Sequence, residues 1–190
     1  MRFRRSAASA GFGEECFDFS EATPDTEYRV GDFINAEHAV VELREFYLDK
    51  GTPSQAEETG GEQVAIVQNS NQARGGAPEL RMYLISANVK PQAPIKKVEL
   101  KFAENIGSLV SNLEVNGQKR VVQGGLSQAN GKVMGRPSKG RAAIIVNLDS
   151  TATGSGFNRG TLALHATNGA IESWSIGGQQ LFVDEVCMTK

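Results

Sequence analysis

The sequence contains few of the residues on which enzyme chemistry most often depends. Two cysteines, two histidines and one tryptophan stand among 190 residues. A disulfide-rich scaffold is therefore not indicated, and the cysteines have no zinc-ligand spacing. The HExxH, GxSxG and phosphate-loop motifs are also missing. We expect both histidines, His38 and His165, to be structural or surface residues.

An excess of one charge and long apolar runs are missing too. The 20 Lys and Arg residues nearly balance the 22 Asp and Glu residues, which gives a formal net charge of -2. Proteins that bind nucleic acid usually carry a basic footprint, so no nucleic acid partner is expected. No apolar run approaches the roughly 20 residues that a membrane-spanning helix needs. Residues 1–13 begin with basic residues but lack the apolar core of a complete secretory signal.

The sequence does have the composition of a globular protein with many turns. It is 39% hydrophobic and 22% charged, and it holds 21 glycines, which in a soluble chain usually mark turns and bulges. The length is ordinary for one domain. We expect residues 1–14, with Arg2, Arg4 and Arg5, to be a flexible or assembly arm, and residues 15–190 to form a single domain.

Short apolar segments separated by Gly, Asn and Pro predict about ten short strands. The alternation is cleanest over residues 95–102. Residues 39–49 mix a strand period with a helical one; their β-branched and aromatic content favours a strand with a bulge near Glu45, and a short helix is the alternative. Asn116-Gly117 lies between two such segments and predicts a two-residue hairpin turn. No segment predicts a long helix, so the chain is expected to be all-β.

The two ends of this predicted domain use the same residue types. Residues 16–19 offer a cysteine, an aspartate and two phenylalanines, and residues 171–190 predict two strands broken at Gly177-Gly178, with Cys187 in the last. We expect the first and last strands to pair and to close an antiparallel, jelly-roll-like β-sandwich. Paired strands would bring Cys16 and Cys187 within disulfide distance. The alternative is two buried free thiols in a reducing cytosol.

The end of the chain also resembles a known family. The run I-E-S-W-S-I-G-G-Q-Q-L-F-V-D-E-V is similar to the last strands of jelly-roll modules of the carbohydrate-binding, galactose-binding-like type. Their final hydrophobic–Asp–x–hydrophobic pattern is matched by Val183, Asp184 and Val186. The resemblance implies a structural calcium near the sheet rim, with Asp18 and Asp184 as its carboxylate ligands. Calcium prefers six to eight oxygen ligands, so backbone oxygens would have to complete the set.

A glycan site would need aromatic platforms and polar groups, and the sequence offers few. Trp174 alternates with Ile176, which favours the core over a platform, and Phe157 is the one aromatic residue in a Gly/Ser-rich loop. Arg74 and Asn71 lie in the polar loop 69–78, which together with the loop 123–140 is the place expected for a groove.

Glycan cleavage needs two carboxyl groups roughly 5–10 Å apart. Acidic residues cluster at 42–49 and 57–62, but without the regular alternation that lines a catalytic cleft. The first hypothesis is therefore a non-catalytic module of an exported or cell-surface protein that binds glycan or another extracellular polymer, with the cytoplasm as the alternative location. The second is a structural subunit that assembles with other copies through its arm and strand edges. A glycan-active enzyme is third.

Overall fold

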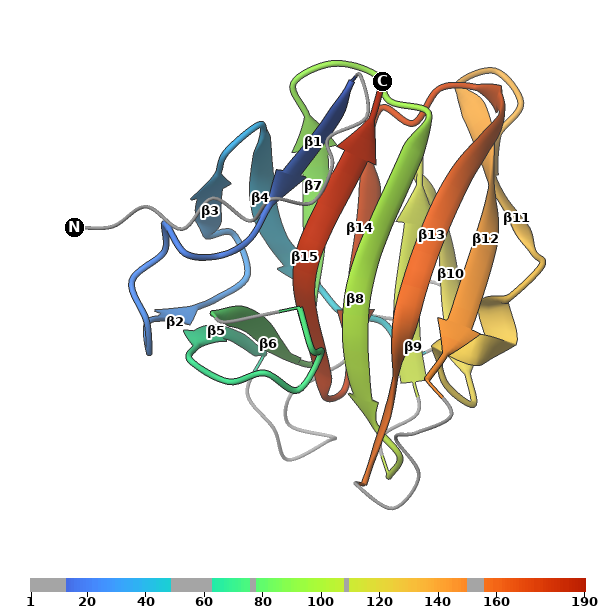
Figure 1. Cartoon of the computed structure of the whole chain (residues 1–190). Helices are drawn as coiled ribbons and strands as arrows, with labels where there is room; N and C mark the ends of the chain where they lie inside the picture. Colours follow the sequence, from blue (N-terminus) through green and yellow to red (C-terminus); the bar gives the residue numbers. More distant parts are fainter. Residues whose placement is uncertain (1–12, 49–62, 76–77, 108–109, 150–155) are drawn as a thin grey trace.

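The computed structural model describes residues 13–48, 63–75, 78–107, 110–149 and 156–190, and these residues form two packed antiparallel sheets (Figure 1). Short segments with alternating apolar residues build strands, because one face of each strand is buried between the sheets. The predicted all-β, jelly-roll-like sandwich is confirmed. Among the described residues, the model has one 3₁₀ turn, η1 (Leu126–Ala129), beside the strands.

One sheet has nine strands, in the order β11-β12-β13-β8-β15-β6-β5-β2, with β1 paired to β15 outside this path. Figure 1 shows the central strands β8 and β15 side by side, with β1 along one edge of β15. The strands of this nine-stranded sheet are β1 (Glu14–Phe17), β2 (Glu27–Tyr28), β5 (Val64–Gln68), β6 (Glu79–Tyr83), β8 (Lys97–Asn105), β11 (Val133–Arg136), β12 (Gly140–Leu148), β13 (Phe157–Gly169) and β15 (Leu181–Thr189).

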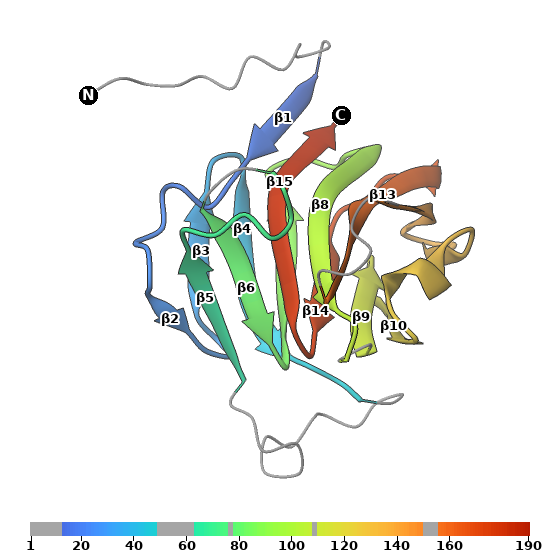
Figure 2. The same cartoon turned by 60° about the horizontal axis from the view of Figure 1, so that its bottom comes forward.

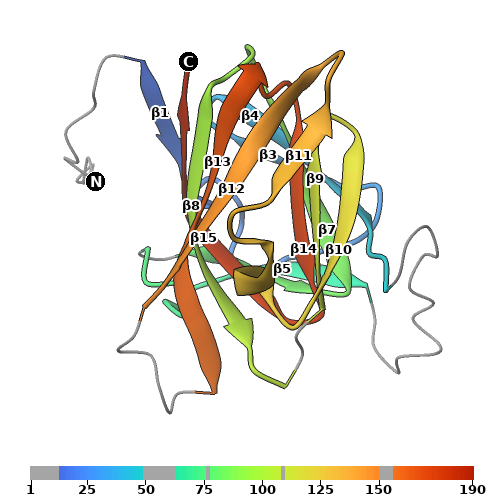
Figure 3. The same cartoon turned by 90° about the vertical axis from the view of Figure 1, so that its right-hand side faces the viewer.

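The other sheet has six strands, in the order β10-β9-β14-β7-β4-β3. Figure 3, a side view, shows β9, β10 and β14 of this sheet facing β8, β12 and β13 of the other. The strands of the six-stranded sheet are β3 (Phe33–Ala36), β4 (Ala39–Glu45), β7 (Ile85–Pro91), β9 (Val110–Val115), β10 (Gln118–Gln123) and β14 (Trp174–Gly178).

The core fills the space between the two sheets. Its largest fully buried side chains include Trp174, Phe46 and Phe102. The alternation predicted for residues 95–102 is present, since Val98, Leu100 and Phe102 are all buried. The indole of Trp174 is 1% exposed and packs in this core. It therefore offers no surface on which a sugar could stack, which excludes it as a ligand platform.

The two ends of the described chain lie side by side, as predicted. Strand β1 pairs with β15, with Cys16 directly opposite Cys187, and the two cysteines form a disulfide. Next to the pair, the backbone N–H of Lys190 donates to the carbonyl oxygen of Gly13 over 3.2 Å. Residues 1–12 of the predicted arm lie outside the described residues.

Three elements differ from the sequence prediction or settle its alternatives. Residues 39–45 form the strand β4 and no helix. The described residues form fifteen strands rather than about ten. Part of the difference comes from β2, β3 and β11, which are segments of two to four residues with little periodicity. Gly177-Gly178 do not break the tail: both lie inside β14, between β7 and β9, and the chain turns at residues 179–180.

Figure 2 shows the end of the sandwich where the segment after β4 crosses toward β9 and β10.

Within the described ranges, no helix is long and apolar enough to cross a membrane.

Candidate functional site

The outward face of the six-stranded sheet is largely polar, with exposed apolar residues near its β3 edge. Alternation turns Ile34, Leu43 and Ala87 inward to the core and their neighbours outward. Strand register then aligns one outward residue from each strand in a row that we call the cross-strand row. Its members are Phe33, Glu42, Asn88, Ser175, Glu114 and Lys119.

Along part of this row, at Ser175, Glu114 and Lys119, the face is hollowed into a trough of about 310 Å³. Its floor comes from the central strands β7 and β14, whose outward residues Ser86, Ser175 and Gly177 are small. A Cβ atom at Gly177 would lie 2.3 Å from Ser86 Oγ, so the floor depends on glycine at this position. The volume lies at the lower end of the roughly 300–1,000 Å³ found for small-molecule sites.

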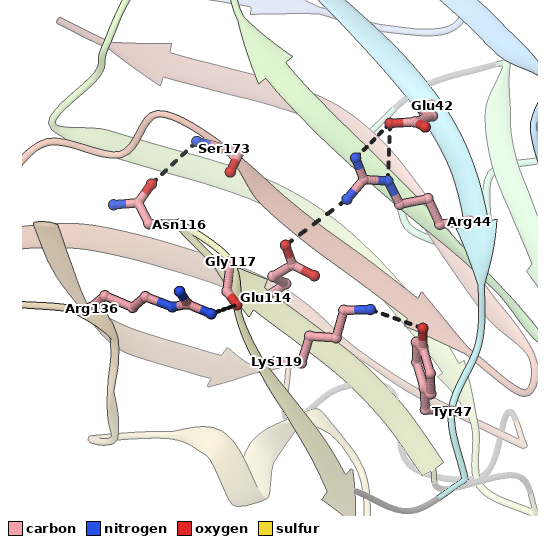
Figure 4. A network of polar contacts seen from close by, with 9 residues as sticks. All are labelled: Glu42, Arg44, Tyr47, Glu114, Asn116, Gly117, Lys119, Arg136 and Ser173. Carbon is pink, nitrogen blue, oxygen red and sulfur yellow. Dashed lines mark hydrogen bonds and ion pairs between the residues drawn. The ribbon is translucent and has the colours of Figure 1, made fainter. Parts of the chain in front are cut away.

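Arg44 on β4 extends over this floor toward β9 (Figure 4). Its Nε and Nη2 donate to Glu42 Oε2 over 2.9 and 2.6 Å, and its Nη1 lies 4.0 Å from Glu114 Oε1. Strands β7 and β14 lie between β4 and β9, so the guanidinium spans the small side chains below it. This cover explains why Asn88 and Ser175, although on an outward face, are 1% and 6% exposed.

Polar atoms under this cover have no partner. Ser86, which is 4% exposed, makes no hydrogen bond through Oγ, and neither polar atom of the Asn88 amide makes one within the described part of the chain. Leaving a buried donor or acceptor unpaired costs about 1–3 kcal/mol. Buried polar groups in native proteins are nearly always paired with protein, water or a ligand. Ser86 lines the trough, and Asn88 lies beside it in the same strand. These atoms therefore mark the floor and its edge as a place where a polar ligand can bind.

Tyr47 closes one end of the trough. Its backbone N–H donates to Asn112 Oδ1, and Asn112 Nδ2 donates to its carbonyl oxygen, each over 2.7 Å. Asn112 thus fixes the segment after β4 against β9. On the far wall, Lys119 Nζ lies 4.2 Å from the centre of the Tyr47 ring and donates to its hydroxyl over 2.9 Å. The aromatic ring and the ammonium group are held as one unit at the end of the trough (Figure 4).

The other predicted ligand candidates lie on the nine-stranded sheet. Phe157 packs edge to face on Phe182, with ring centres 5.5 Å apart. Ala73 belongs to the same apolar cluster as these two rings. The loop that contains Asn71, Ala73 and Arg74 therefore lies over the outward side of that sheet. Phe157, Asn71 and Arg74 are therefore gathered in one region, and none of them lines the trough.

Contacts with the body of the protein hold this loop. The Glu79 side chain, which is fully buried, accepts from the backbone N–H groups of Gln72 and Ala73 and from the Ser70 hydroxyl. Arg74 forms an ion pair of 2.8 Å with Asp149. The loop is thus a packed part of the fold.

Asp184, one of the two predicted metal ligands, is buried under the same loop. Its Oδ1 accepts from the N–H of Glu185 over 2.7 Å, while Oδ2 makes no hydrogen bond. A Cβ atom at Gly75 would lie 2.3 Å from Oδ2, so the loop approaches the carboxyl closely. Burial, with added repulsion from Glu79, Asp18 and Glu185, raises the pKa of Asp184 to about 6.

The fit to calcium rests on Asp184 alone. Its unpaired Oδ2 and the neighbouring carboxylates suit a cation. Asp18 is exposed, and its Oδ1 already accepts from the N–H of Ser20 over 2.9 Å. In the described ranges, no three Asp, Glu, His or Cys side chains are grouped so as to hold a metal ion. Calcium at Asp18 and Asp184 stays a prediction.

Glu42, from the acidic cluster at 42–49, contacts the same guanidinium as Glu114, which was not a predicted catalytic candidate. Glu42 and Glu114 lie on opposite sides of the Arg44 guanidinium, which occupies the space between them. A glycosidic bond would have to sit in that space for the pair to act as acid and base. Glu45, also in the acidic cluster at 42–49, is exposed and lines the trough. Asp49 and the acidic residues at 57–62 lie outside the described residues.

Comparison with known proteins gives little further information. No family model matches the sequence, and no curated protein matches it. Among solved structures, the K2 cleaved adhesin domain of Lys-gingipain (Kgp) is similar, with a TM-score of 0.41 and 11% sequence identity, over 93% of this chain and 99% of that one. The β-sandwich that the resemblance implied is confirmed by the fold itself; membership of the carbohydrate-binding type stays a prediction.

Proposed function

We propose that this chain is a non-catalytic binding module of an exported or cell-surface protein and that a glycan binds in the trough of the six-stranded sheet. The observation that carries the proposal is the set of unpaired polar atoms of Ser86 and Asn88 on and beside its floor. A ligand that forms hydrogen bonds with these atoms removes the free-energy cost of leaving them unpaired in the free protein.

Sugar hydroxyls suit this floor because each can donate and accept. The Asn88 amide offers both a donor and an acceptor, and the Ser86 hydroxyl also acts as either. Arg44, Glu114 and Lys119 add charged groups, whose hydrogen bonds are the stronger kind. The Tyr47 ring supplies an apolar surface at the end of the trough.

The disulfide supports a location outside the reducing cytosol. Disulfides persist in oxidising compartments and are rare in cytosolic proteins. The Cys16–Cys187 bond is therefore in keeping with an exported or surface-exposed protein.

The test is a matched pair of serine variants on a glycan array. Ser86→Ala removes an unpaired hydroxyl, so we expect the thermal midpoint to stay the same or rise. We expect glycan binding to weaken about 2–10-fold, the value of one hydrogen bond. Ser111, buried outside the trough, bonds to Glu104. Ser111→Ala should lower stability and leave binding intact.

Two results would overturn the proposal. One is a wild-type protein that binds no glycan on an array of plant, microbial and animal polysaccharides. The other is a glycan-binding protein whose affinity is reduced by Ser111→Ala as strongly as by Ser86→Ala, since the trough would then not be the site.

The assembly hypothesis stays a prediction. The edge strands β2, β3 and β11 have two to four residues, and short edge strands oppose association through sheet edges. The edge strand β10 has six residues and is the longer edge at which strands of two copies could pair. The mass of the full chain in solution decides between a monomer and an assembly.

A further inference from the structure

Resting on the proposed function, we infer that the glycan is an uncharged, extended chain that crosses the strands along the cross-strand row, with Phe33 as a stacking platform outside the trough. The inference names both the chemical class of the ligand and a residue that the trough does not contain.

The row is longer than the trough. Six strands are separated by five spacings of about 4.8 Å, so the row extends over about 24 Å. The trough is lined from β4 to β10, and β3 lies beyond it. A single sugar would fill the trough alone. A chain that continues in the direction of the row passes over Glu42 and reaches Phe33 on the edge strand.

The charges along the row balance one another. Glu42 and Glu114 are negative, while Lys119 and the overlying Arg44 are positive. Arg44 contacts both glutamates, and Lys119 is engaged with the Tyr47 ring and hydroxyl. An anionic chain would meet the two carboxylates, and a cationic chain would meet the guanidinium and the ammonium group. An uncharged chain can bond to these groups without a net charge to offset.

Phe33 is an exposed aromatic residue on this face. It is 59% exposed, whereas its neighbour Ile34 is 2% exposed and packs in the core. Phe33 lies directly opposite Glu42, and Val40, on the same outward face of β4, is 44% exposed. These two side chains place exposed apolar surface at the rim of the polar face. A ring exposed to this extent offers a surface on which the apolar face of a sugar can stack.

The experiment measures affinity against chain length and charge. Oligosaccharides from disaccharide to hexasaccharide, prepared from uncharged β-glucan, xylan and mannan, are titrated into the full chain by calorimetry, with alginate and pectate oligosaccharides as the charged set. We expect affinity for at least one uncharged series to rise with length. Phe33→Ala should weaken binding of the longest member about 2–10-fold and leave the disaccharide unchanged.

Ile145→Ala is the matched control. Ile145 is also an exposed large apolar residue, at 38%, but it lies on β12 of the other sheet. This substitution should not change the affinity for any oligosaccharide. Thermal melts of both variants show whether either substitution alters the fold.

The outcomes separate this inference from the proposed function. Equal affinity for all lengths, with no effect of Phe33→Ala, overturns the extended chain; if Ser86→Ala still weakens binding, the trough remains the glycan site. Preference for alginate or pectate overturns the uncharged ligand in the same way. Absence of binding to every glycan overturns both proposals.

Discussion

Asp184 is the residue whose charge depends most clearly on the fold. In an unfolded chain an aspartate titrates near 3.9, whereas burial raises the pKa of Asp184 to about 6. Between these values the folded protein holds a proton that the unfolded chain has lost. The contribution of this proton to folding stability is fully present below about pH 4 and is lost as the pH rises from about 4 to 6.

Asp184→Asn should therefore raise the stability near pH 7. The amide oxygen keeps the acceptor for the N–H of Glu185, while the charge is gone. In a chelating buffer, we expect the wild-type free energy of unfolding to lose about 1–3 kcal/mol more than the variant's between pH 4 and pH 7. Urea unfolding at several pH values measures this difference. Glu21→Gln, at an exposed position, is the control, and equal pH profiles of wild type and Asp184→Asn would contradict the prediction.

The same variant tests calcium. If calcium binds at Asp18 and Asp184, adding it near pH 7 should raise the thermal midpoint of the wild type and leave that of Asp184→Asn unchanged. A wild-type melt that responds to neither calcium nor chelator would show that no calcium stabilises the fold.

Individual site residues were the least predictable feature. Trp174 was expected either in the core or on the surface, and its parity with Ile176 correctly favoured the core. Ser86 and Asn88 were overlooked, although they alternate with apolar residues in a strand that proved central. Alternation shows that such residues face outward. Only the strand order shows that long side chains of flanking strands cover them.

At the scale of elements, the hairpin between β9 and β10 shows how a turn residue can also join distant segments. Asn116 and Gly117 have φ angles of 49° and 79°, as the sequence led us to expect of this turn. Beyond that prediction, Asn116 Nδ2 donates to the carbonyl oxygens of Ala170 and Gly140, and its Oδ1 accepts from the N–H of Glu172. One buried amide thus ties the hairpin to β12 and to the segment before β14.

Replacing Asn116 should cost more than a turn residue usually does. We expect Asn116→Ala to lower the free energy of unfolding by about 3–5 kcal/mol, because buried backbone groups lose their partner and alanine disfavours positive φ. Asn116→Gly keeps the φ preference and should cost about 1–2 kcal/mol less. Urea unfolding of both variants separates the two causes. A loss below 1 kcal/mol for Asn116→Ala would show that the side-chain bonds contribute little.

Which elements could be predicted depended on local periodicity. Long strands such as β8 and β12 alternate clearly, because one face packs in the core. The short strand β2 is held by pairing with β5, which lies far along the chain, so local sequence does not show it. The strand β3 forms a hairpin with β4, but its four residues are too few to show a clear period. Gly177-Gly178 were predicted to break the tail because glycine is usual in turns. In the fold Gly177 allows β14 to approach Ser86 and Ile85 of β7 closely, and Gly178 lies against the Leu181 side chain.

At the scale of the whole molecule, the disulfide joins elements that the rest of the fold connects weakly. Strand β1 pairs with β15 alone and lies outside the main order of its sheet. The bond joins Cys16 to Cys187, which are 171 positions apart in the sequence. Pairing of the ends could be predicted from their shared residue types, whereas the order of the strands between them could not, since it depends on packing over the full chain.

Removing this bond should be strongly destabilising. We expect the Cys16→Ser, Cys187→Ser double variant to lose about 2–4 kcal/mol of folding free energy and about 5–15 °C of thermal midpoint. Reductant should lower the midpoint of the wild type and leave that of the variant unchanged. Mass spectrometry without reduction should find the two cysteine peptides linked, and two freely alkylated thiols would contradict the disulfide.

The position of that bond also decides how the protein carries mechanical force. A pull applied to the two ends enters the described fold at Gly13 and Lys190 and reaches Cys16 and Cys187 within a few residues. Beyond that point the load passes through a covalent link, and the strands between the cysteines, with the trough they form, carry none of it. A ligand held on the six-stranded sheet is thus shielded from tension along the chain.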